Sequence, residues 1–121
     1  MEISVKYMAL IYSDPSTVPA YGSAAFGPFM AAYQAANERF IKDGVLVAGE
    51  ALENSSTATT LKVRNGKPET LDGPFAESKE QLGGFYIFDC ASLDDALRYA
   101  AMIPTAATGS VEVRPIQNVP R

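Results

Sequence analysis

The chain has 121 residues, of which 47% are hydrophobic and 20% are charged, a composition typical of one ordinary globular domain. A formal net charge of −4 argues against the clustered basic surface that nucleic-acid binding requires. No stretch approaches the roughly 20 apolar residues of a membrane-spanning helix, and residues 1–15 lack the features of a signal peptide. From the charge and the absence of a long apolar stretch we expect no nucleic-acid and no membrane partner. Because the single cysteine, Cys90, allows no disulfide within the chain, we expect a cytoplasmic protein.

The first part of the chain predicts a strand, a helix and a second strand. Residues 7–12 are continuously apolar, as in a strand that is buried on both faces. Residues 26–43 repeat apolar side chains at spacings of three and four, which predicts a helix. Gly44 is suited to end this helix in a left-handed conformation, and residues 45–52 are typical of the next strand. The apolar helix positions are Phe26, Phe29, Met30, Tyr33, Ala36, Phe40 and Ile41, while Asn37 falls on the polar side.

An inserted hairpin follows. Residues 58–64 are rich in threonine and β-branched side chains, Asn65-Gly66 is a strong turn signal, and residues 67–71 return as a second strand. A charged loop at 72–83 then leads back to the main body of the fold.

The last third predicts a strand, a helix and a strand within the same single domain, 1–121. Residues 84–90 form the strand, and Ser92 begins a capping-box-like sequence that opens a helix. Pro104 ends that helix, and residues 110–116 alternate as a closing strand. The helix positions expected to be buried are Leu93, Ala96, Leu97, Ala100, Ala101 and Ile103.

This order of elements predicts an α+β, ferredoxin-like split βαβ fold, in which two helices cover one face of an antiparallel sheet. The strands at 7–12 and 85–88 are nevertheless apolar on both faces. Because exposed apolar patches of this extent are unusual on monomers, we predict a homodimer joined through the open sheet face. The alternative is that the inserted hairpin folds over that face.

Several kinds of catalytic centre are excluded by the residues that are missing. Without histidine and with one cysteine, the chain has no Cys/His zinc site and no Ser-His or Cys-His pair. It also has no glycine-rich phosphate loop. We therefore expect no metal and no cofactor, and we expect Cys90 to be a buried small hydrophobe.

The loop at 72–83 holds the densest group of charges. Its carboxylates could bind a divalent cation or supply a general base, with a lysine stabilising an anion. Alternatively, Asp72-Gly73-Pro74 makes a turn, Phe75 anchors the loop in the core, and the charges face water. The charged residues in question are Asp72, Glu77, Lys79 and Glu80.

Glu50 is a further candidate because it lies in an otherwise apolar strand. A buried carboxylate needs a partner or shifts its pKa, whereas a Glu at the sheet edge would face solvent. The possible partners are Arg64, Arg98 and Arg114. Strand tyrosines could place a phenol in a pocket, although most pack with the hydroxyl at the surface. They are Tyr7, Tyr12 and Tyr86.

Short motifs spread over nearly the whole chain point to one family. In order they are the strand at 7–12, Gly49–Leu52, Thr57–Thr60, Asp72–Phe75 with Glu77, Lys79 and Glu80, Leu82–Tyr86, and Gly109–Pro115. Together they resemble the YCII-related proteins, in the subgroup named for the Asp-Gly-Pro-Phe motif. The resemblance implies a dimeric α/β barrel, and some relatives are associated with genes for extracytoplasmic-function sigma factors. Better-known members carry a His-Asp pair proposed as catalytic, which a chain without histidine cannot repeat.

Three functions follow as hypotheses. The leading one is a binding or accessory module that holds a small, polar molecule between the sheet and the 72–83 loop of each subunit. The second is an acid-base enzyme (a lyase, isomerase or cofactor-free oxygenase) with Asp72, Glu77 or Glu50 as the base. The third is a protein-interaction role in sigma-factor regulation. The residues predicted to bind the ligand are Tyr12, Glu50, Asp72, Glu77, Lys79 and Arg114.

Overall fold

A computed structural model describes residues 5–119 of the chain. Its strands and helices are β1 (Val5–Ser13), α1 (Phe26–Lys42), β2 (Leu46–Ala51), β3 (Thr59–Arg64), β4 (Lys67–Asp72), β5 (Gln81–Cys90), α2 (Leu93–Ala100) and β6 (Ser110–Pro115). Three short 3-10 helices are η1 (Pro15–Thr17), η2 (Ser55–Thr57) and η3 (Pro104–Ala107). Each predicted strand and helix is present, with its bounds shifted by a few residues at most.

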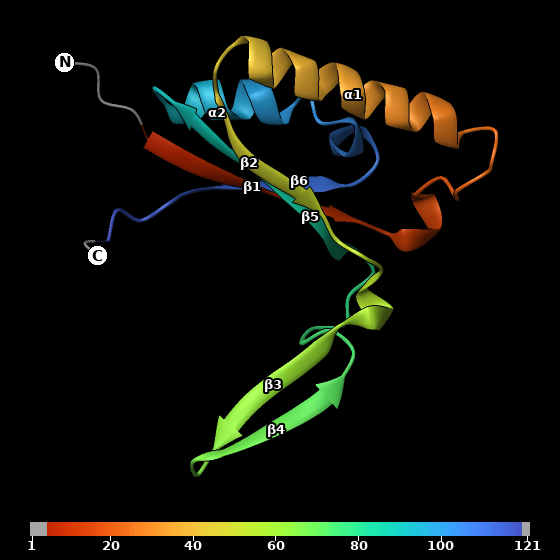
Figure 1. Cartoon of the computed structure of the whole chain (residues 1–121), viewed down its shortest axis with the longest axis vertical. Helices are drawn as coiled ribbons and strands as arrows, with labels where there is room; N and C mark the ends of the chain where they lie inside the picture. Colours follow the sequence, from red (N-terminus) through yellow and green to blue (C-terminus); the bar gives the residue numbers. More distant parts are fainter. Residues whose placement is uncertain (1–4, 120–121) are drawn as a thin grey trace.

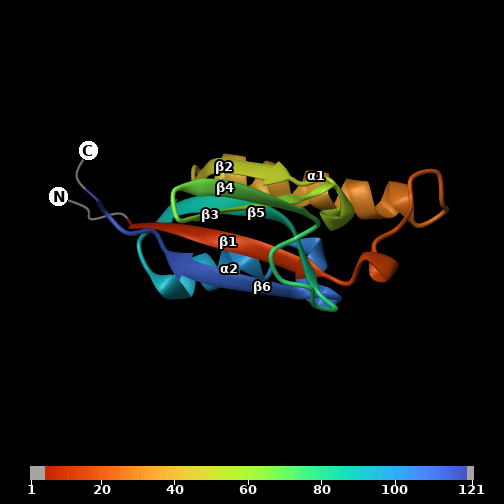
Figure 2. The same ribbon diagram turned by 90° about the horizontal axis from the view of Figure 1, so that it is seen from below.

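The main sheet has four strands in the order β2-β5-β1-β6, and every neighbouring pair is antiparallel. Both helices lie on one side of this sheet, as Figure 1 shows. In Figure 2 the four strands run side by side with the helices behind them. This arrangement is the predicted α+β, ferredoxin-like fold.

The core lies between the helices and the sheet and is built on aromatic rings. The fully buried Phe40 of α1 makes edge-to-face contacts with Tyr86 and Phe88 of β5, at centroid distances of 5.3 and 4.9 Å. Its ring also meets Tyr99 of α2 edge-on at 6.0 Å. One residue therefore joins both helices to the central strand, through the geometry that aromatic pairs favour.

Helix α1 ends as its sequence predicts. Gly44 adopts φ +72°, its N–H donates to the carbonyl of Ile41, and the next N–H, that of Val45, donates to the carbonyl of Phe40. This pair of bonds is the Schellman motif, for which glycine is favoured because it has no Cβ to clash at positive φ. It turns the chain directly into β2.

Helix α2 begins as predicted and buries the predicted Ala96 and Ala100, but not the predicted leucines. The Ser92 hydroxyl accepts a hydrogen bond from the Asp95 N–H at 3.2 Å, as an N-cap should. The predicted core positions Leu93 and Leu97 are instead about half exposed. The large ring of Tyr99 packs against Phe40, which rotates the helix so that its alanines and Tyr99 face the sheet.

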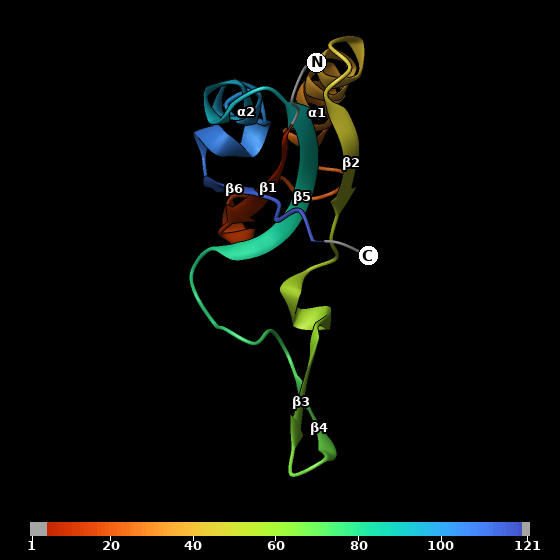
Figure 3. The same cartoon turned by 90° about the vertical axis from the view of Figure 1, so that its left-hand side faces the viewer.

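The other sheet face is apolar and has no element of the described chain packed over it. It carries Met8 and Leu10 of β1 and Phe85 and Ile87 of β5, all only partly buried. The prediction offered as the alternative to a homodimer, that the hairpin β3–β4 folds over this face, is wrong for residues 5–119. The hairpin projects from the body on the side away from the helices, as Figures 1 and 3 show.

The hairpin itself is built on the predicted turn. Asn65 and Gly66 have φ values of 52° and 75°, the two positive values that a tight type I′ turn requires. Several of its apolar side chains are exposed, among them Leu61, Val63 and Leu71. These side chains have no intramolecular partner in the described chain. An isolated two-stranded hairpin is only marginally stable in water, so a surface that covers them would stabilise it.

Candidate functional site

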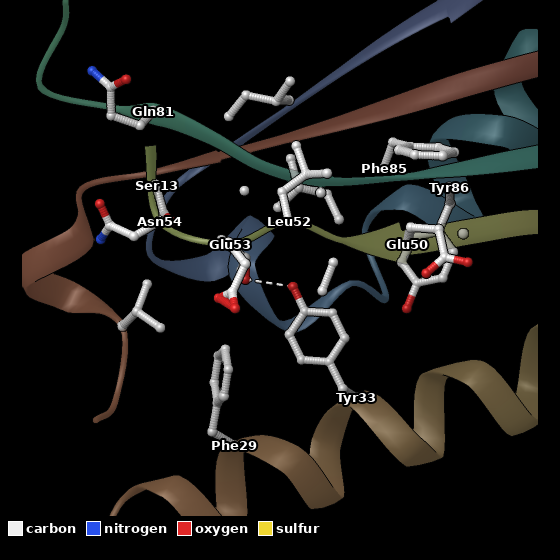
Figure 4. Close-up of a pocket in the computed structure, with 18 of the residues that line it drawn as sticks. Ser13, Phe29, Tyr33, Glu50, Leu52, Glu53, Asn54, Gln81, Phe85 and Tyr86 are labelled. Atoms are coloured by element: carbon white, nitrogen blue, oxygen red, sulfur yellow. Dashed lines mark hydrogen bonds between the residues drawn. The ribbon is translucent and has the colours of Figure 1, made fainter. Parts of the chain in front are cut away.

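A cavity of about 790 Å³ opens between α1 and the sheet. Its walls come from α1, the end of β1 and the segment after it, β2 with the residues that follow, and the beginning of β5 (Figure 4). The cavity lies where β2 and β5 diverge into the hairpin, so it borders the 72–83 loop only at residues 81–83. The cavity therefore lies closer to the helix layer than the pocket that the sequence predicts between the sheet and the loop.

One part of the apolar stripe on α1 lines the cavity and is not packed against protein. Phe29 and Tyr33 line the cavity as an edge-to-face pair with ring centroids 5.2 Å apart. Met30 and Ile41 also line it and are substantially exposed, although the periodicity of the helix predicts them to face the core. The helix thus presents its apolar face partly to the core and partly to an open, ligand-sized space.

One polar contact at the cavity joins α1 to the 3-10 helix η3. The Tyr33 hydroxyl lies 2.6 Å from the Thr105 hydroxyl, and Thr105 is only 5% exposed. Burial raises the pKa of the Tyr33 phenol above its usual value, so the group stays protonated at neutral pH. It can act as a neutral hydrogen-bond donor or acceptor.

A second polar contact joins β5 to α1. The Tyr86 hydroxyl donates to Oδ1 of Asn37, and burial raises the pKa of Tyr86 to about 12. The ring fits because β2 has Gly49 beside it: a Cβ at that position would lie 2.7 Å from the Tyr86 ring. The half-buried Asn37 is thus not on the polar outer side of α1 where its spacing predicts it.

Ser13 supplies a third polar group at the end of β1. It is 9% exposed and lines the cavity, where Figure 4 labels it. Within residues 5–119 its hydroxyl makes no side-chain hydrogen bond, and only Oδ1 of Asp89 is a buried side-chain atom without a partner, so the Ser13 oxygen is accessible from the cavity. An accessible hydroxyl without a protein partner is a group that a ligand or water can satisfy.

Comparisons with known proteins show the family of the chain. The family model described as "YCII-related domain" matches residues 5–119. The chain belongs to the YCII-related family. It is also 40% identical over 112 residues to "Uncharacterized protein R00369" of Rhizobium meliloti (strain 1021), covering 91% of this chain and 90% of that protein.

In this YCII-related protein, Glu50 is the one member of the predicted ligand-binding set that borders the cavity. Its side chain is exposed, and its register opposite Phe85 places it on the open sheet face. None of the three candidate arginines pairs with it. Arg98 pairs with Asp95 and Arg114 with Glu112, each at 2.7 Å, while Arg64 donates to the carbonyl of Val63 at 3.1 Å. The solvent-facing interpretation of Glu50 is the one that fits.

The other predicted residues lie elsewhere in the chain. Tyr12 alternates with the buried Ile11 and Ser13 along β1, and Arg114 is opposite Met8, which puts both on the open sheet face. Three more residues are exposed on the hairpin and its loop, outside the cavity: Asp72, Glu77 and Lys79. A single copy of the chain therefore does not bring the six candidates together.

The loop also differs from its expected structure at Phe75. The structural alternative for the loop has this ring anchored in the core, but the ring is 78% exposed, with the Lys62 ammonium 5.3 Å from its centroid. The reason is that the projecting hairpin carries the loop away from the body. The predicted turn does form, because Gly73 adopts φ +100° and its N–H donates to the carbonyl of Ala58 at 2.7 Å.

The remaining chemical candidates can be placed briefly. Among residues 5–119, no three acidic, cysteine or histidine side chains gather into a possible metal site, and Glu80 instead accepts a hydrogen bond from the Ser110 hydroxyl. Cys90 is buried as predicted, and burial raises the pKa of its thiol. No helix of the described chain is long and apolar enough to cross a membrane.

Proposed function

We propose that this YCII-related protein is a small-molecule-binding module whose ligand occupies the cavity between α1 and the sheet. The observation that carries the proposal is the cavity itself. Its volume of about 790 Å³ lies within the range of roughly 300–1,000 Å³ typical of ligand pockets. Like such pockets, it combines apolar walls with a few polar groups, here Ser13, Tyr33 and Tyr86.

We further propose that the protein works as a homodimer joined through the open sheet face, in a reducing compartment such as the cytoplasm. The apolar side chains on that face support this, since a second copy would bury them. The hairpin supports it as well, because it projects on the side of the sheet away from the helices (Figure 1) and its apolar residues Leu61 and Val63 are exposed. A partner there would also lie near the loop that carries Asp72, Glu77 and Lys79, which keeps these residues as ligand-binding candidates.

The binding role is better supported than the acid-base enzyme. That enzyme requires a carboxylate that is sequestered enough to act as a base at neutral pH. Asp72, Glu77 and Glu50 are all exposed in the described chain. The buried and half-buried polar groups that line the cavity are hydroxyls and amides, which bind and orient molecules, whereas its carboxylates belong to exposed residues.

The test is a thermal-shift screen of a broad metabolite library, with hits confirmed by native mass spectrometry. A ligand at 100 times its Kd should add roughly 2.7 kcal/mol of apparent stability. Leu52→Trp, which places a large ring at the cavity wall, should abolish the shift. Leu93→Trp is the matched control, because Leu93 is 46% exposed against 49% for Leu52 but lies on α2 outside the cavity. A library without hits, or a shift that both variants retain, would disprove the binding site.

A further inference from the structure

The charges around the cavity point to the chemical class of its ligand. Among residues 5–119, no lysine or arginine lines it, and the two carboxylates that do, those of Glu50 and Glu53, belong to exposed residues. A bound anion would lose its hydration without gaining a cationic partner, and the nearest charge on the helix side of the sheet would be the carboxylate of Glu53 (Figure 4). The walls therefore disfavour carboxylates, phosphates and sulfates.

The buried part of the cavity is also poorly suited to a cation. The buried and half-buried polar side chains that line it are all neutral: Ser13, Tyr33, Asn37, Ser55, Gln81, Tyr86 and Thr105. An ammonium group there would be desolvated without a buried carboxylate to pair with. The exposed carboxylates at the rim remain in water, where ion pairs contribute little.

The hydrogen bonds already formed show which groups remain for a ligand. Oδ1 of Asn37 accepts from Tyr86, which leaves the two N–H donors of the Asn37 amide without a partner among the described residues. The hydroxyl of Ser13, a residue that is 9% exposed, likewise has no side-chain partner in residues 5–119 and is accessible from the cavity. A ligand oxygen can accept from either group, and a ligand hydroxyl can also donate to Ser13.

We infer that the ligand, if the proposed function holds, is an uncharged and largely apolar ring compound whose hydroxyl or carbonyl oxygen hydrogen-bonds Ser13. The ring body lies against Phe29 and Tyr33, whose paired side chains form the apolar wall of the cavity. The oxygen lies at the end of β1, where Ser13 is the group without a protein partner. This ligand is less polar than the sequence led us to expect, because the cavity lies on the helix side of the sheet and not beside the charged loop.

The experiment compares four probes with the same ring system: acetylnaphthalene, naphthoate, naphthylmethylamine and naphthalene itself. Each is titrated into the full-length protein and followed by two-dimensional amide NMR, which gives both the affinity and the residues affected. We expect the ketone to bind at least about tenfold more tightly than the carboxylate or the amine, with shifts in the residues of α1 and β1 that line the cavity. Tighter binding by either charged probe, or equal binding by all, would overturn the inference.

Two variants test the position of the oxygen. Ser13→Ala should weaken the ketone by about five- to tenfold and leave naphthalene unchanged, because only the ketone can use the hydroxyl. Ser56→Ala, at an exposed site outside the cavity, should affect neither probe. An equal loss for both probes in Ser13→Ala, or no loss for the ketone, contradicts the assignment. Failure of the ketone to bind also overturns the inference, whereas the proposed function stands or falls separately with the library screen and the Leu52→Trp variant.

Discussion

The two faces of the four-stranded sheet are similarly apolar but differ in what covers them. Along β1 the residues alternate between the faces: Tyr7, Ala9 and Ile11 are buried beneath the helices, while Met8 and Leu10 on the other face are only partly buried. The same alternation runs along β5. Neighbouring residues of one strand therefore have different surroundings, although their hydrophobicity is alike.

This difference shows that an apolar pattern fixes which surfaces need cover but not what provides it. On the helix side, α1 and α2 cover the sheet, and each is the next α-helix after its strand, β1 or β5. On the open side nothing in the described chain provides it, and each Å² left in water forgoes roughly 25 cal/mol. The helix side should therefore control the stability of the chain, and the open side should control its association.

The largest effect should come from the centre of the helix side. Phe40→Ala removes the ring that joins α1, β5 and α2, and it should lower the free energy of unfolding by about 3–5 kcal/mol. Ile41→Ala is the matched control on the same helix, because Ile41 is 65% exposed, and it should cost about 0.5 kcal/mol or less. Urea unfolding followed by circular dichroism measures both. Equal losses would mean that the aromatic cluster is not the core.

The next largest effect should appear on the open face. Leu10→Asp places a charge at its centre, opposite Phe85 on one side and Glu112 on the other. Each dimer would bury two such charges, so the Kd of the dimer should rise at least about 100-fold, or about 2.7 kcal/mol. Sedimentation velocity measures the association, and circular dichroism checks that the fold is kept.

The control for this variant is Leu93→Asp, because Leu93 is an exposed apolar residue on α2, away from the open face. It should leave the dimer intact. A wild-type protein that remains monomeric at about 100 μM, or a Leu10→Asp variant that dimerises normally, would refute the proposed assembly and leave the open face without an explanation.

The features that the sequence predicts correctly are those with local signals. Gly44 ends α1, Asn65-Gly66 turns the hairpin, and Ser92 caps α2, each through backbone or side-chain bonds within a few residues. The apolar character of both sheet faces is equally local, since it follows from alternate residues of one strand. Such signals give the order of the elements and their pairing almost completely.

The candidate site could not be predicted in the same way because its contacts are distant in the sequence. Tyr33 and Thr105 are 72 positions apart, and Tyr86 and Asn37 are 49 apart. Periodicity predicts a core position for Tyr33, and no local pattern marks Ser13 as a site residue. The sequence favours the charged loop instead, because charge density is visible in a sequence whereas a cavity is not. Gly49 was a possible signal, since glycine inside a strand can mark a close approach of another group.

A smaller effect on stability should come from the Tyr86 hydroxyl, which lies at the cavity on the helix side of the sheet. Tyr86→Phe removes the hydrogen bond to Asn37 and should cost about 1 kcal/mol at neutral pH. The pKa of Tyr86, about 12, is above the ordinary value of 10.0 expected in the unfolded chain. The folded protein therefore holds this proton more tightly, so the contribution is complete below pH 10 and is lost as the pH rises through about 12.

The measurement is the free energy of unfolding from pH 8 to pH 12 for the wild type and for Tyr86→Phe. The wild type should lose its advantage over the variant in the alkaline part of this range. A difference that stays constant with pH would show that the phenol of Tyr86 is not held in a desolvated site. The neighbouring Tyr33→Phe variant should behave in the same direction, because burial also raises the pKa of Tyr33.

The smallest effect should come from the outer rim of the helix layer, where Asp43 links the two helices. Its Oδ2 accepts hydrogen bonds from Nε of Arg39 at 2.9 Å and from the Tyr99 hydroxyl at 2.8 Å. Both bonds lower the pKa of the Asp43 carboxyl below its ordinary value of 3.8, the bond from Arg39 most strongly. The stabilisation is therefore present above about pH 4 and is lost as the pH falls further. Asp43→Asn should slightly lower the Tm at pH 7 and have less effect at pH 2.5, while Glu38→Gln on the same helix should change neither value. An effect of Asp43→Asn that persisted at low pH would mean that the charge of Asp43 does not matter and that packing alone joins α1 to α2.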